Sequence, residues 1–105
     1  MAEKEYTTFE EFYPYYLDQH RHTGTRITHF VGTSLFFLFA ITAIIQLNAW
    51  FVLMGVFSAY LFAWIGHFFI EKNKPATFKY PWMSLKGDFK LYFEILTGKQ
   101  GFKTN

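Results

Sequence analysis

The side chains most able to do chemistry in this chain are four histidines and one glutamate. They are His20, His22, His29, His67 and Glu71. Imidazole nitrogens combined with a carboxylate oxygen bind iron, zinc, manganese or copper, and an iron ion with open positions in such a set favours chemistry with dioxygen. The chain has no cysteine, which excludes a thiolate metal site, a cysteine nucleophile and a disulfide framework.

The spacing of these residues indicates that they meet. His29 starts one long apolar segment and His67 ends the next one. If the segments are antiparallel helices, the climb over 29–46 and the descent over 49–67 each cover roughly 26 Å at 1.5 Å per residue, so the two histidines return to the same depth. Glu71 follows His67 at i+4, where two side chains share one face of an α-helix. The other two histidines precede the first segment on that same side.

A simpler interpretation of the same residues stays open. Histidines at a membrane interface commonly only anchor the chain among lipid headgroups, and Glu71 beside Lys72 and Lys74 can be a solvated charge cluster. The gathering of all four histidines beside one glutamate supports the metal site about as strongly as the anchoring role. Lys72 and Lys74 are also candidate contacts for a substrate carboxylate, although basic residues here more commonly fix topology and touch anionic lipid. No nucleic-acid partner is predicted.

The elements that must position these residues are two apolar helices. No Asp, Glu, Lys or Arg occurs between Arg26 and Glu71, so the charged residues all lie in the two flanks. Each apolar segment, 30–46 and 49–66, is close to the length that crosses roughly 30 Å of hydrocarbon. Both segments are apolar on every side, so a soluble hairpin would need a partner over every face.

We therefore predict an all-α integral membrane protein: a two-helix hairpin with an interfacial helix at each end of the chain. It forms one membrane domain, residues 1–105, with transmembrane helices at about 29–46 and 49–70. The turn between the helices carries no basic residue, whereas both flanks do. The positive-inside rule then places both termini in the cytoplasm.

Local signals predict a helix in each flank. Thr8 followed by Glu11 has the form of a capping box and opens a helix over about 9–19. A second helix, at about 84–97, ends at Gly98 and has one apolar face, which suits it to the headgroup region or to docking on the hairpin. That face consists of Leu85, Phe89, Tyr92, Phe93 and Leu96.

Several motifs resemble a family of small membrane proteins long described as a domain of unknown function. They are YLDQHRHTGTRITHFVG at 16–32, GHFFIEKNKPA at 66–76, TFKYP at 77–81 and SLKGD at 84–88, and the resemblance covers about 10–100. Eukaryotic relatives are Fe(II)-dependent 2-hydroxy fatty acid dioxygenases that shorten the acyl chain by one carbon in α-oxidation. The short two-span form is similar to the bacterial branch, which implies an inner-membrane location.

By that resemblance, His20, His29 and His67 are iron ligands, and Glu71 is a ligand or an outer partner of the ligands. His22 stands at a position that varies in the family, so it is only a possible addition. The implied function is an Fe(II)-dependent oxygenase that uses O2 on a fatty acyl substrate lying in the lipid bilayer. The alternative is a non-enzymatic lipid-binding or assembly module whose histidines are structural or bind zinc. Two helices enclose a lipid poorly, so we also expect a homo-oligomer.

Overall fold

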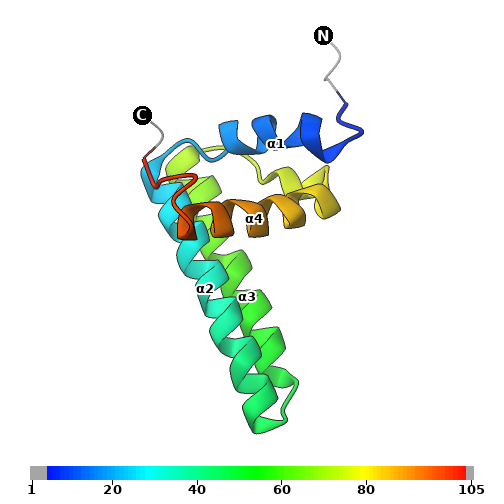
Figure 1. Cartoon of the computed structure of the whole chain (residues 1–105), viewed down its shortest axis with the longest axis vertical. Coiled ribbons are helices and arrows are strands. Elements are labelled where there is room, and N and C mark those ends of the chain that lie inside the picture. The colour runs from blue at the N-terminus through cyan, green and yellow to red at the C-terminus, as the bar shows by residue number, and fades with distance from the viewer. Residues whose placement is uncertain (1–4, 104–105) are drawn as a thin grey trace.

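The computed structural model describes residues 5–103, and within this range the fold is all-helical without strands. Its elements are α1 (Phe9–Asp18), α2 (Thr23–Gln46), α3 (Trp50–Ile65), the π-helical segment η1 (Gly66–Glu71), the 3-10 turn η2 (Ala76–Phe78) and α4 (Pro81–Leu96). Helices α2 and α3 form a long antiparallel rod, and α1 and α4 lie across one end of it (Figure 1). We call residues 38–55 the stalk and the other described residues the head.

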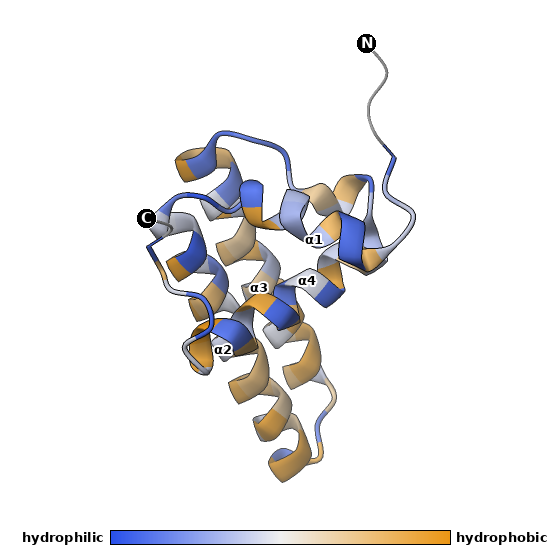
Figure 2. Cartoon of the chain, turned by 45° about the horizontal axis from the view of Figure 1, so that its top comes forward, coloured by the Kyte–Doolittle hydropathy of each residue, from blue (hydrophilic) through white to orange (hydrophobic). Residues whose placement is uncertain are grey.

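Both arms of the hairpin are long and apolar enough to cross a membrane. The arms are Thr23–Gln46 and Trp50–Glu71, and only 22% and 17% of their most apolar windows are buried inside the fold. The core helix of a soluble protein would be mostly buried, whereas these helices turn apolar side chains outward. The stalk is mainly hydrophobic apart from the turn at its end, whereas most hydrophilic residues lie in the head (Figure 2).

The helix boundaries differ from the predicted ones at two places. Helix α2 begins at Thr23 rather than at about residue 29, because Arg26 is buried by hydrogen bonds to protein carbonyls and continues the helix. Helix α4 begins at Pro81 rather than at Ser84. A proline suits the first helical position, since the N–H group that it lacks would have no partner within the helix there. Hydropathy locates the apolar part of a helix, which here is shorter than the helix itself.

Small residues bring the two arms into close contact. A Cβ atom on Gly55 would lie 3.0 Å from Cβ of Phe39, and one on Gly66 would lie 2.5 Å from Oγ1 of Thr28. Glycine at these positions therefore lets the backbones of α2 and α3 approach each other, as small residues do between helices in lipid. Both glycines of the second arm therefore face α2.

The helices of the head follow the predicted signals. Thr8 is the N-cap of α1, and its hydroxyl accepts a hydrogen bond from the Glu11 N–H at 3.2 Å. Gly98 has φ +86°, as expected just after a helix end. Helix α4 packs against both α1 and α2. It therefore buries Leu91 toward α1 as well as placing Phe89 and Tyr92 of its predicted apolar face against aromatic residues of α2.

Candidate metal centre

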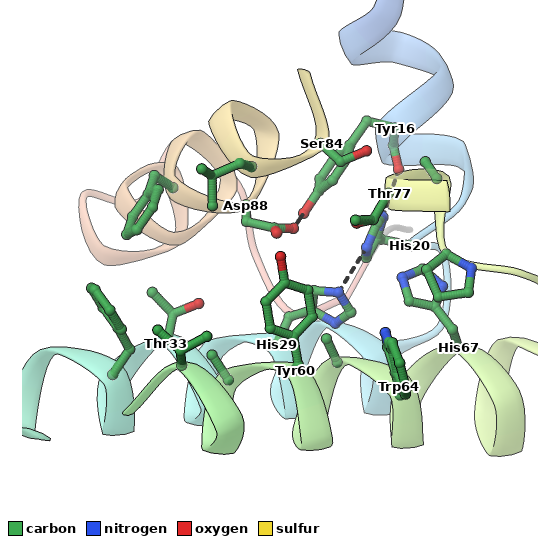
Figure 3. A pocket seen from close by; sticks show the side chains of 18 residues that line it. Tyr16, His20, His29, Thr33, Tyr60, Trp64, His67, Thr77, Ser84 and Asp88 are labelled. Carbon is green, nitrogen blue, oxygen red and sulfur yellow. Dashed lines mark hydrogen bonds between the residues drawn. The ribbon is translucent and has the colours of Figure 1, made fainter. Parts of the chain in front are cut away.

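Three histidines from three different segments meet inside the head. His20 lies in the turn after α1, His29 lies on the second turn of α2, and His67 lies in η1. All three are buried, and one ligand nitrogen from each lies within 4.8 Å of the other two (Figure 3). The centroids of the three rings are 4.3 to 4.9 Å apart. The prediction from the equal lengths of the two arms, that His29 and His67 lie close together, is therefore correct.

Backbone carbonyl groups fix the orientation of two of the rings. Nδ1 of His20 lies 2.7 Å from the carbonyl oxygen of Tyr16, and Nδ1 of His29 lies 3.1 Å from that of Thr25. A carbonyl oxygen can only accept a hydrogen bond, so each Nδ1 carries the proton and donates it. Each Nε2 atom is then unprotonated, with a free lone pair that points toward the other histidines. Metal-binding histidines commonly hold their other nitrogen in this way.

The third ring is held by a side chain. Nδ1 of His67 lies 2.7 Å from Oδ1 of Asn73, whose amide nitrogen donates to the carbonyl oxygen of Gln19 at 3.2 Å and to its Oε1 at 3.0 Å. These two bonds identify the amide oxygen of Asn73 as the atom facing His67, so Nδ1 of His67 is again the donor. All three histidines thus offer an unprotonated Nε2.

The resulting geometry fits a metal ion. Nε2 of His20 lies 3.0 Å from Nε2 of His29, and two lone pairs at this distance repel each other unless a cation lies beside both. Two nitrogens that each bind a metal at roughly 2.1 Å, at a right angle, stand roughly 3.0 Å apart. Three neutral imidazoles suit iron or zinc and leave further coordination positions for other ligands.

Burial keeps at least one of these rings neutral. Burial in the head, together with the neighbouring His29 and His67, lowers the pKa of His20 well below its ordinary value. The neutral form is the form that binds metals. The ring of His20 also stacks on Tyr16, with a centroid distance of 4.1 Å.

Glu71 is not brought into the histidine group; instead it contacts His22. Its carboxylate accepts a hydrogen bond from the backbone N–H of His22 at 2.5 Å and lies 3.8 Å from Nε2 of the same residue. The segment that carries both Glu71 and His67 is a π-helix rather than the α-helix that the i+4 prediction assumed, and the Glu71 carboxylate is engaged by the start of α2 rather than by the three histidines. Glu71 thereby joins the end of η1 to the start of α2.

The remaining predicted site residues lie outside the centre. His22 is the N-cap residue of α2, and its side chain is exposed. Lys72 and Lys74 are exposed as well and do not line the cavity next to the histidines. The structure thus gathers three of the predicted residues and keeps the other four apart from them.

A cavity of about 350 Å³ leads away from the three histidines. The hairpin forms one wall, with α3 contributing residues from Val56 to Trp64, which is roughly 12 Å of helix. Helix α4 contributes Leu85 and Phe89 to the opposite wall, and Thr77 of the 3-10 turn η2 lines the cavity at the histidine end (Figure 3). The cavity is therefore polar at the histidine end and apolar along most of its length.

Four residues of this region were not predicted as site residues. They are Tyr16, Asn73, Ser84 and Asp88. The Tyr16 hydroxyl donates a hydrogen bond to Asp88, burial raises the pKa of Asp88 to about 7, and burial with the nearby Asp88 raises that of Tyr16 well above its ordinary value. The i, i+4 spacing of Ser84 and Asp88 on an amphipathic helix is the signal that could have indicated them.

Fold and site together define a class of protein: a membrane-type helical hairpin with a buried three-histidine centre at the end of an apolar cavity. The chain belongs to the Mpo1-like family, described as 2-hydroxy-palmitic acid dioxygenase Mpo1-like, whose model matches residues 6–100. Comparison with curated proteins and with solved structures gave no match. The family membership agrees with the resemblance seen in the sequence motifs.

Proposed function

We propose that this protein is an Fe(II)-dependent dioxygenase that shortens 2-hydroxy fatty acids by one carbon. The observation that carries the proposal is the convergence of three imidazoles whose Nδ1 atoms are all engaged as donors. His20, His29 and His67 would hold the iron, and Glu71 would support them from outside by fixing the start of α2. The family description supports the substrate class. Zinc is the alternative metal.

The cavity supports a long apolar ligand with a polar end. Its histidine end suits the carboxyl and hydroxyl groups, and its apolar length suits an acyl chain. Tyr60, Trp64 and Leu85 line the cavity and are also 40 to 42% exposed on the outer surface. A fatty acid dissolved in the bilayer can therefore enter from the side without crossing water. Lys72 and Lys74 would not contact a fatty acid bound in this way.

The conversion balances without an added reductant. A 2-hydroxy acid and dioxygen give the acid that is one carbon shorter, carbon dioxide and water, and all the electrons that dioxygen takes come from the substrate. Bound iron would supply the activation of dioxygen. The chain itself would orient the head of the substrate, exclude water from the buried centre and hold the three Nδ1–H groups in hydrogen bonds to their oxygen acceptors.

We further propose that the hairpin lies in a bacterial inner membrane with both termini in the cytoplasm. The support is the apolar, outward-facing stalk and the basic residues of both flanks. A reporter inserted between Leu47 and Asn48 should be external, and reporters at both termini should be cytoplasmic. A turn reporter active in the cytoplasm would contradict this topology. Association into a homo-oligomer stays a prediction.

The function is tested with purified protein in detergent, loaded anaerobically with Fe(II) and given 2-hydroxy-palmitic acid and oxygen. The expected product is the fatty acid with one carbon fewer, formed with consumption of dioxygen. His29→Gln should lose turnover by more than about 100-fold, since a ligand is lost. His22→Gln is the matched control, and its loss should be much smaller. Protein that binds zinc and fatty acid but forms no shortened acid would favour the binding-module alternative.

A further inference from the structure

Ser84 has a buried hydroxyl group without a hydrogen-bond partner. Ser84 is only 2% exposed. Among the described residues, its Oγ atom is the one buried side-chain polar atom that forms no hydrogen bond. Buried hydroxyl groups without a partner are rare in native proteins, because the lost hydrogen bond to water is costly, so such a group calls for a partner from outside the chain, such as a ligand or a water molecule. Ser84 lines the cavity, so a bound ligand can be that partner.

Asp88 lies one helical turn further along α4 and lines the same cavity. Its carboxyl group accepts a hydrogen bond from the Tyr16 hydroxyl, and it forms no ion pair with a residue of the range 5–103. A carboxyl group can accept several hydrogen bonds, so one from Tyr16 leaves further capacity. Ser84 and Asp88 are at i and i+4, which places both on one face of α4.

Tyr16 links this face to the histidine centre. A Cβ atom on Gly87 would lie 2.9 Å from the Tyr16 ring, so the ring packs directly on α4 between Ser84 and Asp88. The Tyr16 ring also stacks on the ring of His20, and the two ring centroids are 4.1 Å apart. Ser84 and Asp88 therefore stand at the polar end of the cavity, near the histidines rather than along the apolar walls (Figure 3).

We propose that Ser84 and Asp88 recognise the polar head of a 2-hydroxy carboxylic acid. The Ser84 hydroxyl donates a hydrogen bond to a carboxylate oxygen of the ligand, and Asp88 accepts one from the hydroxyl group at its second carbon. This inference rests on the proposed function and deepens it. The carboxylate of an unsubstituted fatty acid has no donor for Asp88. Asp88 therefore distinguishes the two carboxylates, whereas Ser84 binds both.

The test measures binding rather than turnover. Iron-loaded protein in detergent, kept anaerobic, is titrated with 2-hydroxy-palmitic acid and with palmitic acid. The change in tryptophan fluorescence follows both, since one of the three tryptophans, Trp64, lines the cavity. The parent should prefer the 2-hydroxy acid by about 10-fold, the value of one buried hydrogen bond. Ser84→Ala should weaken both acids by about 10-fold, and Asp88→Ala should remove the preference.

Two further variants keep the result clear. Asp88→Ala leaves the Tyr16 hydroxyl unpaired, so the double variant Tyr16→Phe with Asp88→Ala removes that hydroxyl as well and should show the same lost preference. Ser34→Ala removes a serine hydroxyl that lies 3.0 Å from the Tyr92 hydroxyl outside the cavity, and it should bind both acids like the parent. All variants should keep the iron content of the parent.

Other outcomes separate this inference from the proposed function. An Asp88→Ala variant that keeps the full preference, or a Ser84→Ala variant that binds both acids as tightly as the parent, would overturn the role given to that residue. Loss of iron in either variant would overturn it as well. A parent that holds iron but binds both acids equally would overturn this role alone. A parent that holds neither iron nor fatty acid would overturn the proposed function, and the role of Ser84 and Asp88 would fall with it.

Discussion

The head and the stalk differ in the kinds of side chain that they expose and bury. In the stalk, large apolar side chains face outward, and Ile44, Ile45 and Leu47 are 72 to 91% exposed. In the head, six polar or charged side chains are buried beside a small apolar core: His20, Thr25, Arg26, His29, His67 and Ser84 are at most 8% exposed. Exposed apolar side chains suit a lipid environment, whereas buried polar side chains each need a hydrogen-bond partner.

This difference means that the two regions should respond differently to substitution. The stalk depends on hydropathy and close helix contact, so it should tolerate any apolar side chain on its outer face. The head depends on particular hydrogen bonds, such as the one between Nδ1 of His67 and Asn73. Changes there should alter metal or ligand binding while leaving the hairpin inserted.

The largest expected effect is on insertion of the stalk. Leu38 is 61% exposed on the outer face of α2. Leu38→Arg should reduce membrane insertion strongly, since Arg at the centre of a spanning helix costs roughly 2.5–3.5 kcal/mol on the biological scale. Leu38→Met is the matched control and should insert like the parent. The fraction of chain that resists extraction with alkaline carbonate measures both, and equal insertion of the two variants would contradict a lipid-facing stalk.

A smaller effect is expected from a hydrogen-bond partner in the head. Asn73→Leu removes the group that orients His67 and should weaken metal affinity by roughly 10- to 100-fold. Asn48→Leu is the control in the stalk, where the side chain accepts a hydrogen bond from the Trp50 N–H at 3.0 Å, and it should leave metal affinity unchanged. Competition with a metal-binding dye measures both affinities. An equal change in the two variants would show that Asn73 has no special role.

The smallest effect is expected at the outer edge of the head. Thr8→Ala removes the N-cap of α1 and should lower the free energy of unfolding by about 1 kcal/mol. Thr7→Ala is the control, because the Thr7 hydroxyl contacts only the Glu11 carboxylate at 3.3 Å and caps no backbone group. Thermal unfolding in detergent should separate the two variants by a few degrees. A larger effect of Thr7→Ala would contradict the capping role of Thr8.

The sequence was sufficient for the stalk and for part of the head. The apolar spans, the Thr8 cap and the helix end at Gly98 are local signals, and the equal lengths of the two arms predicted that His29 and His67 meet. The π-helical turn of η1 has no local signal, so the positions of Glu71 and Asn73 relative to His67 could not be predicted. The prediction of which α4 residues are buried was also incomplete, because a helix that packs against two neighbours buries more than one face.

The most direct test of the metal centre is the amount of iron held per chain after anaerobic loading with Fe(II) and desalting. The parent and His22→Gln should each retain about one iron ion per chain. His20→Gln, His29→Gln and His67→Gln should each lose it while keeping the helical content of the parent by circular dichroism. Glutamine keeps the size and hydrogen bonding of the side chain but is a poor iron ligand. A parent that holds no iron, or a His67→Gln variant that holds a full complement, would contradict the centre described above.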